Sequence, residues 1–256
     1  MSKTFLIVGD SWSQGEIEHY PGQERSHIVV HRGLIQYLED AGHTVYNRGG
    51  LGWSNIEAYW QTYSAFFDST NNKYPPPISD DINYIIWFTT DSFRDLEESQ
   101  YLERIKVNKS IKKTFVETLD GCYSKFNELS DRIGKKIFLI GGWTPVTPEV
   151  EKYKNLFTII PNVHEFLVPE SDISITQACL HLFPYVKETA AMAKNFLTNE
   201  EIDLIKQEII ELSMELNYAE NVRLSNRSLF YPDNDHPNRQ GHYKIFEKVK
   251  ETLCLE

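Results

Sequence analysis

Three short apolar runs in the first half of the chain alternate with stretches whose apolar residues recur at helical spacing. The runs are residues 4–9 (TFLIVG), 82–88 (INYIIWF) and 136–140 (KIFLI), and each leads into small or polar residues. The second run is apolar on both faces, which is typical of a central strand in a parallel sheet. Repeated strand–helix units of this kind predict an α/β protein with helices on both faces of a parallel sheet.

Between these runs the spacing predicts helices and one further strand. Apolar residues recur every three or four positions in residues 27–41, and the pattern stops at Gly42. Residues 44–46 restart a short strand, and a long charged helix is expected over about residues 102–132. The last segment, residues 238–253, also has helical spacing.

Residues 144–230 do not continue this pattern. The stretch contains Pro-rich turns, a candidate strand near residues 157–160 and a candidate amphipathic helix from about 199 to 216. We interpret it as an insertion over the sheet edge or the active site. The whole chain, residues 1–256, is then one domain.

Charge and cysteine content limit the class of partner and the compartment. A net charge of −11 disfavours broad binding to nucleic acid. Three widely spaced cysteines, without a CxxC pair, form neither a disulfide framework nor a zinc site. The first apolar run is too short for a signal peptide, and no run approaches the roughly 18 residues of a membrane span. These features predict a cytoplasmic protein without nucleic-acid or membrane partners, and they leave its oligomeric state open.

Two loops near the N-terminus carry candidate chemistry. Ser11 lies in a Gly-Asp-Ser turn directly after the first strand, where its hydroxyl and its own N–H can face one point. The alternative is that Asp10 or Ser11 only caps a helix. The second loop, residues 47–55 (NRGGLGWSN), has glycines that allow positive φ and so can point an N–H at an oxyanion. It lacks a GxGxxG pattern for phosphate, and a plain turn is the other alternative.

A third loop precedes the C-terminal helix. Asp233 lies three residues before His236, so its carboxylate can accept a hydrogen bond from one imidazole nitrogen. The other nitrogen would then face a serine. Two alternatives remain: a metal site formed by Asp233, Asp235, His236 and His242, and a solvated acidic turn before a helix capped by Asn238.

Together these loops resemble the conserved blocks of the SGNH (GDSL) hydrolase family. Gly9-Asp10-Ser11 matches the first block, and Asn47 with Gly52 matches the second. The last block is matched by Asp233-Asn234-Asp235-His236-Pro237-Asn238. The resemblance implies a three-layer α/β/α sandwich around a flavodoxin-like parallel sheet of about five strands. It also implies a catalytic triad of Ser11, His236 and Asp233.

One block departs from the family pattern. Thr90 stands where the family has an asparagine that completes the oxyanion hole, and Phe88 replaces a glycine. Loss of one such donor costs on the order of 3–4 kcal/mol of transition-state stabilisation. The expected oxyanion and substrate-binding residues are therefore Gly52, Thr90 and, as a substitute donor, Asn55. The string WFTTDSFRD indicates a divergent subgroup, compatible with a virus-encoded protein in the host cytoplasm.

The resemblance implies ester hydrolysis through an acyl-enzyme, with no metal or organic cofactor. An O-acetylated carbohydrate and a small acyl ester are equally compatible substrates. The aromatic side chains Trp12, Trp53, Trp87 and Phe93 lie in or beside these loops, where they can form a substrate pocket or belong to the core. The missing asparagine keeps open a second class of function, a weakly active or inactive binding or structural protein with the same fold.

Overall fold

Five parallel strands form the central sheet, in the order β4-β1-β5-β6-β7. They are β1 (Thr4–Val8), β4 (Thr44–Asn47), β5 (Tyr84–Thr89), β6 (Ile137–Gly141) and β7 (Leu156–Ile160). The second strand of this sheet lies outside the first, and the later strands continue on the other side. This is the order of flavodoxin-like folds, so the predicted sheet is confirmed.

The computed structural model describes residues 1–19, 27–67, 73–78, 81–142, 144–169, 198–205, 207–208, 210–211, 229–230 and 236–255. Cys122 and Cys254 carry free thiols, whereas Cys179 lies outside these residues.

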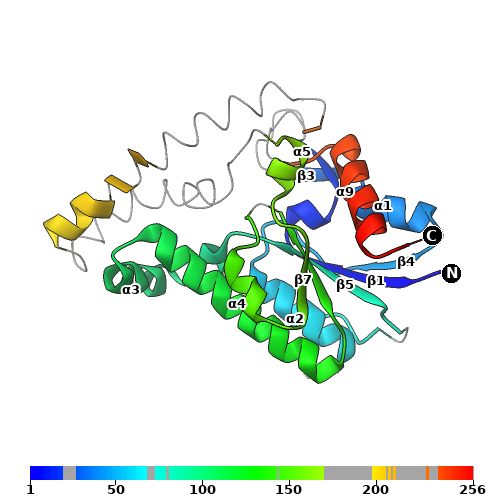
Figure 1. Ribbon diagram of the computed structural model, residues 1–256, viewed down its shortest axis with the longest axis horizontal. Helices are drawn as coiled ribbons and strands as arrows, with labels where there is room; N and C mark the ends of the chain where they lie inside the picture. Colours follow the sequence, from blue (N-terminus) through cyan, green and yellow to red (C-terminus); the bar gives the residue numbers. More distant parts are fainter. Residues whose placement is uncertain are drawn as a thin grey trace.

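Helices cover both faces of the sheet (Figure 1). On one face lie α2 (Asn55–Phe66), α3 (Glu98–Asn108) and α4 (Ile111–Ile133). On the other lie α1 (Gly33–Asp40), α5 (Val163–Leu167) and α9 (Arg239–Thr252). Side chains alternate along β1, so that Leu6 packs into the first core and Ile7 into the second. The predicted three-layer α/β/α sandwich is confirmed.

Among the described helices, none combines the length and the apolar character that are needed to cross a membrane.

The prediction of a helix over residues 27–41 is wrong for its first part and confirmed for its second. Residues His27–His31 form β3, which pairs antiparallel with β2 (Glu16–His19). The helix α1 starts only at Gly33, whose positive φ of +52° separates it from β3. Three consecutive β-branched residues, Ile28, Val29 and Val30, fill β3, and such residues favour strands over helices.

The predicted insertion also needs correction at its start. β7 is an edge strand of the central sheet, and α5 packs into the core beside α9. The chain between β6 and β7 contains a short 3-10 helix, η3 (Pro148–Lys152). Residues 199–205 are helical as expected, and much of the remaining stretch lies outside the described residues. Assignment of the chain to one domain stays a prediction.

Because all five strands are parallel, their carboxyl ends meet at one edge of the sheet. The loops after β1, β4 and β5 start at this edge, and β1 lies between β4 and β5. Ligands of open α/β sheets bind at the carboxyl edge where the strand order reverses. The three loops that carry Ser11, Gly52 and Thr90 therefore share this position.

Candidate active site

Ser11 begins a 3-10 helix, η1 (Ser11–Ser13), directly after β1. The turn needs Gly9, whose φ is +141° and where a Cβ would lie 2.8 Å from both the Cβ and the carbonyl oxygen of Phe88. Asp10 caps the helix, because its Oδ1 accepts from the N–H of Trp12 at 3.0 Å. The capping alternative thus holds for Asp10, and it leaves the Ser11 hydroxyl available.

The Ser11 hydroxyl lies 2.8 Å from Nε2 of His236, although 225 positions separate the two residues. Both residues are buried, at 9% and 8% exposure. The His236 ring lies 5.7 Å from that of Trp12, itself buried. Just beyond His236, Asn238 caps α9 by accepting from Gln240 and Gly241, which fixes where the loop ends. The fold therefore brings the predicted nucleophile and base together.

Asp233 lies outside the described residues, and so does Asp235. The role of Asp233 in orienting His236 therefore stays a prediction. The metal-site alternative, which requires both carboxylates, is likewise untested.

The oxyanion role of the Ser11 and Gly52 backbone N–H groups stays a prediction, and both groups are available for it. Neither the Ser11 N–H nor the Gly52 N–H donates to another of the described residues. Gly52 is exposed with a φ of +70°, and a Cβ there would meet nothing within 4 Å, so conformation rather than crowding calls for glycine. The N–H of Gly50 donates to the carbonyl of Gly9 at 3.1 Å and joins the glycine loop to the Ser11 turn.

Thr90 is fully buried, and its hydroxyl donates to Oδ2 of Asp10 at 2.5 Å. Asn55, also fully buried, donates one amide hydrogen to the Thr90 carbonyl at 2.9 Å and the other to Asp95 at 3.0 Å. A hydroxyl has one hydrogen to donate and an amide two. In this arrangement neither side chain keeps a donor for substrate, which counts against the oxyanion role expected of both.

No role for Arg94 was predicted from the sequence, yet this residue contacts Asp10 and Thr90. It lies in η2 (Ser92–Asp95), directly beyond β5. Its Nη1 donates to Oδ2 of Asp10 at 3.3 Å and to the Thr90 hydroxyl oxygen at 3.2 Å. The signal available in the sequence was a basic residue four positions after Thr90, and one such residue in a loop forms no pattern.

The Asp10 carboxylate connects these groups electrostatically. Asp10 is 1% exposed, and burial raises its pKa above the usual value. The Arg94 guanidinium, the Thr90 hydroxyl and the Trp12 N–H oppose this increase in pKa. Asp10 is thus a buried acid adjacent to Ser11, held by three donors.

Two further titratable groups lie near the site. Burial raises the pKa of Asp91 to about 7, and its Oδ1 accepts from the Phe93 N–H at 2.9 Å as the cap of η2. Burial lowers the pKa of His242 to about 3. His242 packs against Gly33, where a Cβ would lie 2.6 Å from the imidazole Cγ. Both residues are structural in this arrangement.

The aromatic residues expected near the loops divide into core and surface. Trp87 is fully buried and stacks on Phe126 at 3.9 Å, so it belongs to the core. Trp12 and Phe93 are buried as well, at 1% and 5% exposure. Trp53 is half-buried in the glycine loop and remains the candidate for contact with a substrate.

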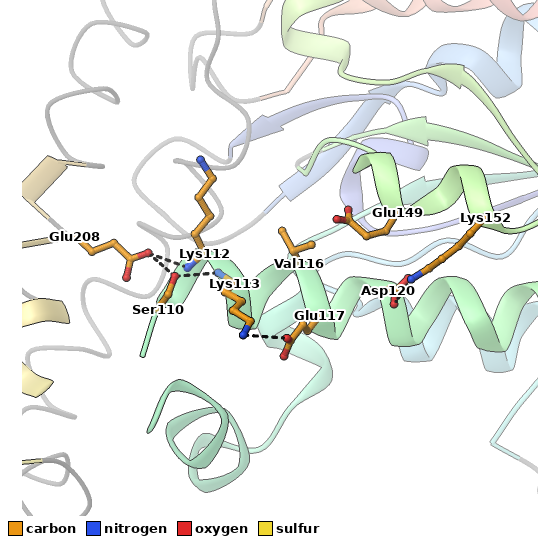
Figure 2. Close-up of a pocket in the computed structure, with 9 residues that line it drawn as sticks. All are labelled: Ser110, Lys112, Lys113, Val116, Glu117, Asp120, Glu149, Lys152 and Glu208. Atoms are coloured by element: carbon orange, nitrogen blue, oxygen red, sulfur yellow. Dashed lines mark hydrogen bonds and ion pairs between the residues drawn. The ribbon is translucent and has the colours of Figure 1, made fainter. Parts of the chain in front are cut away.

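A cavity of about 560 Å³ lies elsewhere, at the N-terminal end of α4 (Figure 2). It is lined by Ser110, Lys112, Lys113, Val116, Glu117, Asp120, Glu149, Lys152 and Glu208. None of these residues was predicted from the sequence to be catalytic or to bind the oxyanion. Because its charged lining residues carry both signs and Ser11 is not among them, we do not place the active site there.

No protein-family model and no curated protein matches the sequence. Solved structures match along the whole chain, and their names describe SGNH hydrolases, lipolytic G-D-S-L proteins and esterases. A lipolytic G-D-S-L protein from Veillonella parvula is 12% identical over 100% of both chains, with a TM-score of 0.42.

The acetylxylan esterase Axe2 from Geobacillus stearothermophilus is 12% identical over 99% of this chain and 95% of its own, with a TM-score of 0.42. The esterase EstA from Pseudoalteromonas sp. is 12% identical over 99% of this chain and 100% of its own, with a TM-score of 0.38. The structural neighbours are thus SGNH and GDSL hydrolases and esterases at low sequence identity. At this low identity, the function has to be inferred from the residues at the site of this chain, above all Ser11 and His236.

Proposed function

We propose that this protein is a serine esterase that cleaves a carboxylic ester through an acyl-enzyme on Ser11. The observation that carries the proposal is the 2.8 Å contact between the Ser11 hydroxyl and Nε2 of His236. A serine is a weak nucleophile until an adjacent base takes its proton, and a histidine within hydrogen-bond distance is the usual base. The position of this pair at the carboxyl edge of the sheet supports the same proposal.

In the proposed mechanism, Nε2 of His236 accepts the Ser11 proton as Oγ attacks the ester carbonyl carbon. The N–H groups of Ser11 and Gly52 donate to the oxyanion of the tetrahedral intermediate. His236 then gives its proton to the leaving alcohol, and the C–O bond breaks to leave an acyl-serine. A water molecule, deprotonated by His236, repeats the attack and releases the acid. Asp233 is the proposed partner of the second imidazole nitrogen.

The proposed substrate is an uncharged ester, either an O-acetylated carbohydrate or a small acyl ester. A net charge of −11 disfavours polyanionic substrates. Gly52 is exposed and Trp53 is half-buried, so a substrate can reach the glycine loop from solvent.

A specific observation also favours the second candidate, a non-catalytic binding protein. The side chains of Thr90 and Asn55 donate to protein atoms, so an oxyanion hole would rest on two backbone N–H groups alone. A site that lacks one donor loses about 10²–10³ in kcat.

Labelling with a fluorophosphonate probe separates the two candidates. The esterase predicts labelling of the wild type, loss of labelling in Ser11→Ala, and turnover of p-nitrophenyl acetate that disappears with it. Ser124→Ala is the matched control, since Ser124 lies on α4 and its hydroxyl contacts Glu128 and Tyr153, not residues of the Ser11 turn. An unlabelled wild type without turnover would favour the binding protein instead.

A further inference from the structure

Arg94 is the one charged donor that the structure joins to both Asp10 and Thr90 among the described residues. Asp10 directly precedes Ser11, and its carboxylate is held on the other side by the Trp12 N–H. The guanidinium is therefore attached to the turn that carries the nucleophile. Its position is set by a buried partner, not by a solvent-exposed contact.

Most of the donors of Arg94 are unused. A guanidinium has five N–H donors in one plane. Only Nη1 donates to other described residues, to Asp10 and to Thr90, so Nε and Nη2 have no partner among these residues. The Arg94 side chain is 29% exposed, whereas that of Asp10 is 1% exposed. Nη1 of the guanidinium is thus held by two buried residues, and the other donors are available.

We propose that Arg94 is a catalytic residue, which donates an N–H to the oxyanion and replaces the side-chain donor that Thr90 and Asn55 cannot supply. This inference rests on the proposed esterase function. A donor fixed in place before the reaction stabilises developing charge without reorganisation. A charged donor also forms a stronger hydrogen bond to an oxyanion than a neutral amide does.

Asp10 gives this arrangement its geometry. The carboxylate and the Thr90 hydroxyl oxygen hold Nη1 from two sides, which restricts the rotation of a long side chain. Arg94 keeps its charge, but the nearby Asp10 carboxylate partly offsets the attraction of the guanidinium for more distant anionic groups. Arg94 should therefore act on the oxyanion of any ester substrate, and it should not select substrates that carry an anionic group.

The test compares kcat and KM of Arg94→Met with those of the wild type, on p-nitrophenyl acetate and on a matched ester that carries a free carboxylate. We expect kcat to fall by about 10²-fold or more on both esters, while KM stays within about threefold. Arg104→Met is the control, because Arg104 is exposed on α3 and contacts Thr118, away from Ser11. It should leave both constants unchanged.

Two additional variants keep the result interpretable if loss of the Asp10 partner destabilises the protein. Arg94→Lys retains a cation that can pair with Asp10, so we expect the thermal midpoint of unfolding to stay unchanged. It lacks the planar set of guanidinium N–H donors, which an ammonium group does not replace. We therefore expect kcat still to fall at least tenfold. In Arg94→Ala, guanidinium chloride at millimolar concentrations should restore part of kcat, and sodium chloride at equal ionic strength should not.

The outcomes separate the two proposals. Unchanged kcat in folded Arg94→Met and Arg94→Lys, with an active wild type and Ser11 still labelled, overturns the role of Arg94 and leaves the esterase intact. A rise in KM confined to the carboxylate-bearing ester also overturns it, because Arg94 would then bind substrate. An inactive and unlabelled wild type overturns both proposals.

Discussion

The side-chain amide of Asn55 and the backbone of Thr90 form a reciprocal pair of hydrogen bonds. The Asn55 amide donates to the Thr90 carbonyl at 2.9 Å, and the Thr90 N–H donates to the Asn55 oxygen at 3.0 Å. Asp95 completes the cluster, since it accepts from Asn55 and from the N–H of Ile56. The first turn of α2 is thereby joined to the loop after β5 that presents Thr90 and Arg94.

Replacement of Asn55 by leucine should therefore destabilise the fold and disturb the site. The substitution leaves the buried N–H and carbonyl of Thr90 without these partners, at a cost of about 1–3 kcal/mol for each unsatisfied group. We expect the free energy of unfolding in urea to fall by roughly 3 kcal/mol. Asn155→Ala is the control, because the Asn155 amide bonds to Asp131 at an exposed position. Equal effects of the two variants would contradict a special role for the Asn55–Thr90 pair.

Much of the candidate site was predictable because it depends on strand order. Ser11 and His236 follow from short motifs at the two ends of the chain, and a parallel sheet brings such loops to one edge. The apolar run of β5 predicted a central strand, since only a strand buried on both faces is apolar on both.

Contacts between loops were not predictable in the same way. Arg94 reaches Asp10 only because β5 lies beside β1, and neither residue belongs to a periodic pattern. The same limit explains the error at β3, where the apolar spacing of residues 27–31 fits a helix as well as a strand. Its pairing with β2 decides between them. The candidate strand near residues 157–160 is confirmed as β7, but its place at the edge of the central sheet was not predicted, because it lies in a stretch without clear strand–helix alternation.

His242 should make stability depend on pH in the acidic range. Its pKa is about 3 in the fold and 6.5 in an unfolded chain, so between these values the unfolded state binds the extra proton. Stability is therefore fully present above pH 6.5 and declines as the pH falls toward 3. The slope is at most about 1.4 kcal/mol for each pH unit.

The variant His242→Leu removes this titration. Urea unfolding should show that the wild type loses roughly 2 kcal/mol more than the variant when the pH is lowered from about 7 to about 5. Parallel profiles for the two proteins would mean that His242 is not held neutral by burial.

Asp91 should act with the opposite sign. Burial raises its pKa to about 7 from an ordinary value of 3.8, so the folded state binds the extra proton between these values. Its contribution to stability is therefore lost as the pH rises from 3.8 to about 7. Asp91→Asn keeps an oxygen that can accept from the Phe93 N–H but cannot ionise.

We expect Asp91→Asn to be more stable than the wild type at about pH 8, by on the order of 1–4 kcal/mol, and to lose this advantage near pH 4. Thermal midpoints measured at the two pH values provide the check. A constant difference between the two proteins would show that the carboxyl does not titrate in this range.

Glu208 occupies the N-terminus of α4 (Figure 2). Its carboxylate accepts from the Ser110 hydroxyl at 2.9 Å and from the N–H groups of Ile111 and Lys112 at 2.8 and 3.1 Å. These N–H groups belong to the first turn, which has no intrahelical acceptor for them. An anion there also interacts favourably with the helix dipole. The contact fastens the helical segment that begins at residue 199 to the sandwich.

Glu208→Gln should therefore lower the free energy of unfolding by about 1 kcal/mol, because the amide retains one acceptor oxygen and loses the charge. Glu211→Gln is the matched control, as Glu211 is exposed and accepts only from Gln207 among the described residues. It should change stability by no more than about 0.5 kcal/mol. Urea unfolding at low and high salt separates the contributions, since salt screens the interaction of the charge with the helix end but not the hydrogen bonds. If the two variants have the same free energy of unfolding at low salt, the Glu208 carboxylate does not stabilise α4.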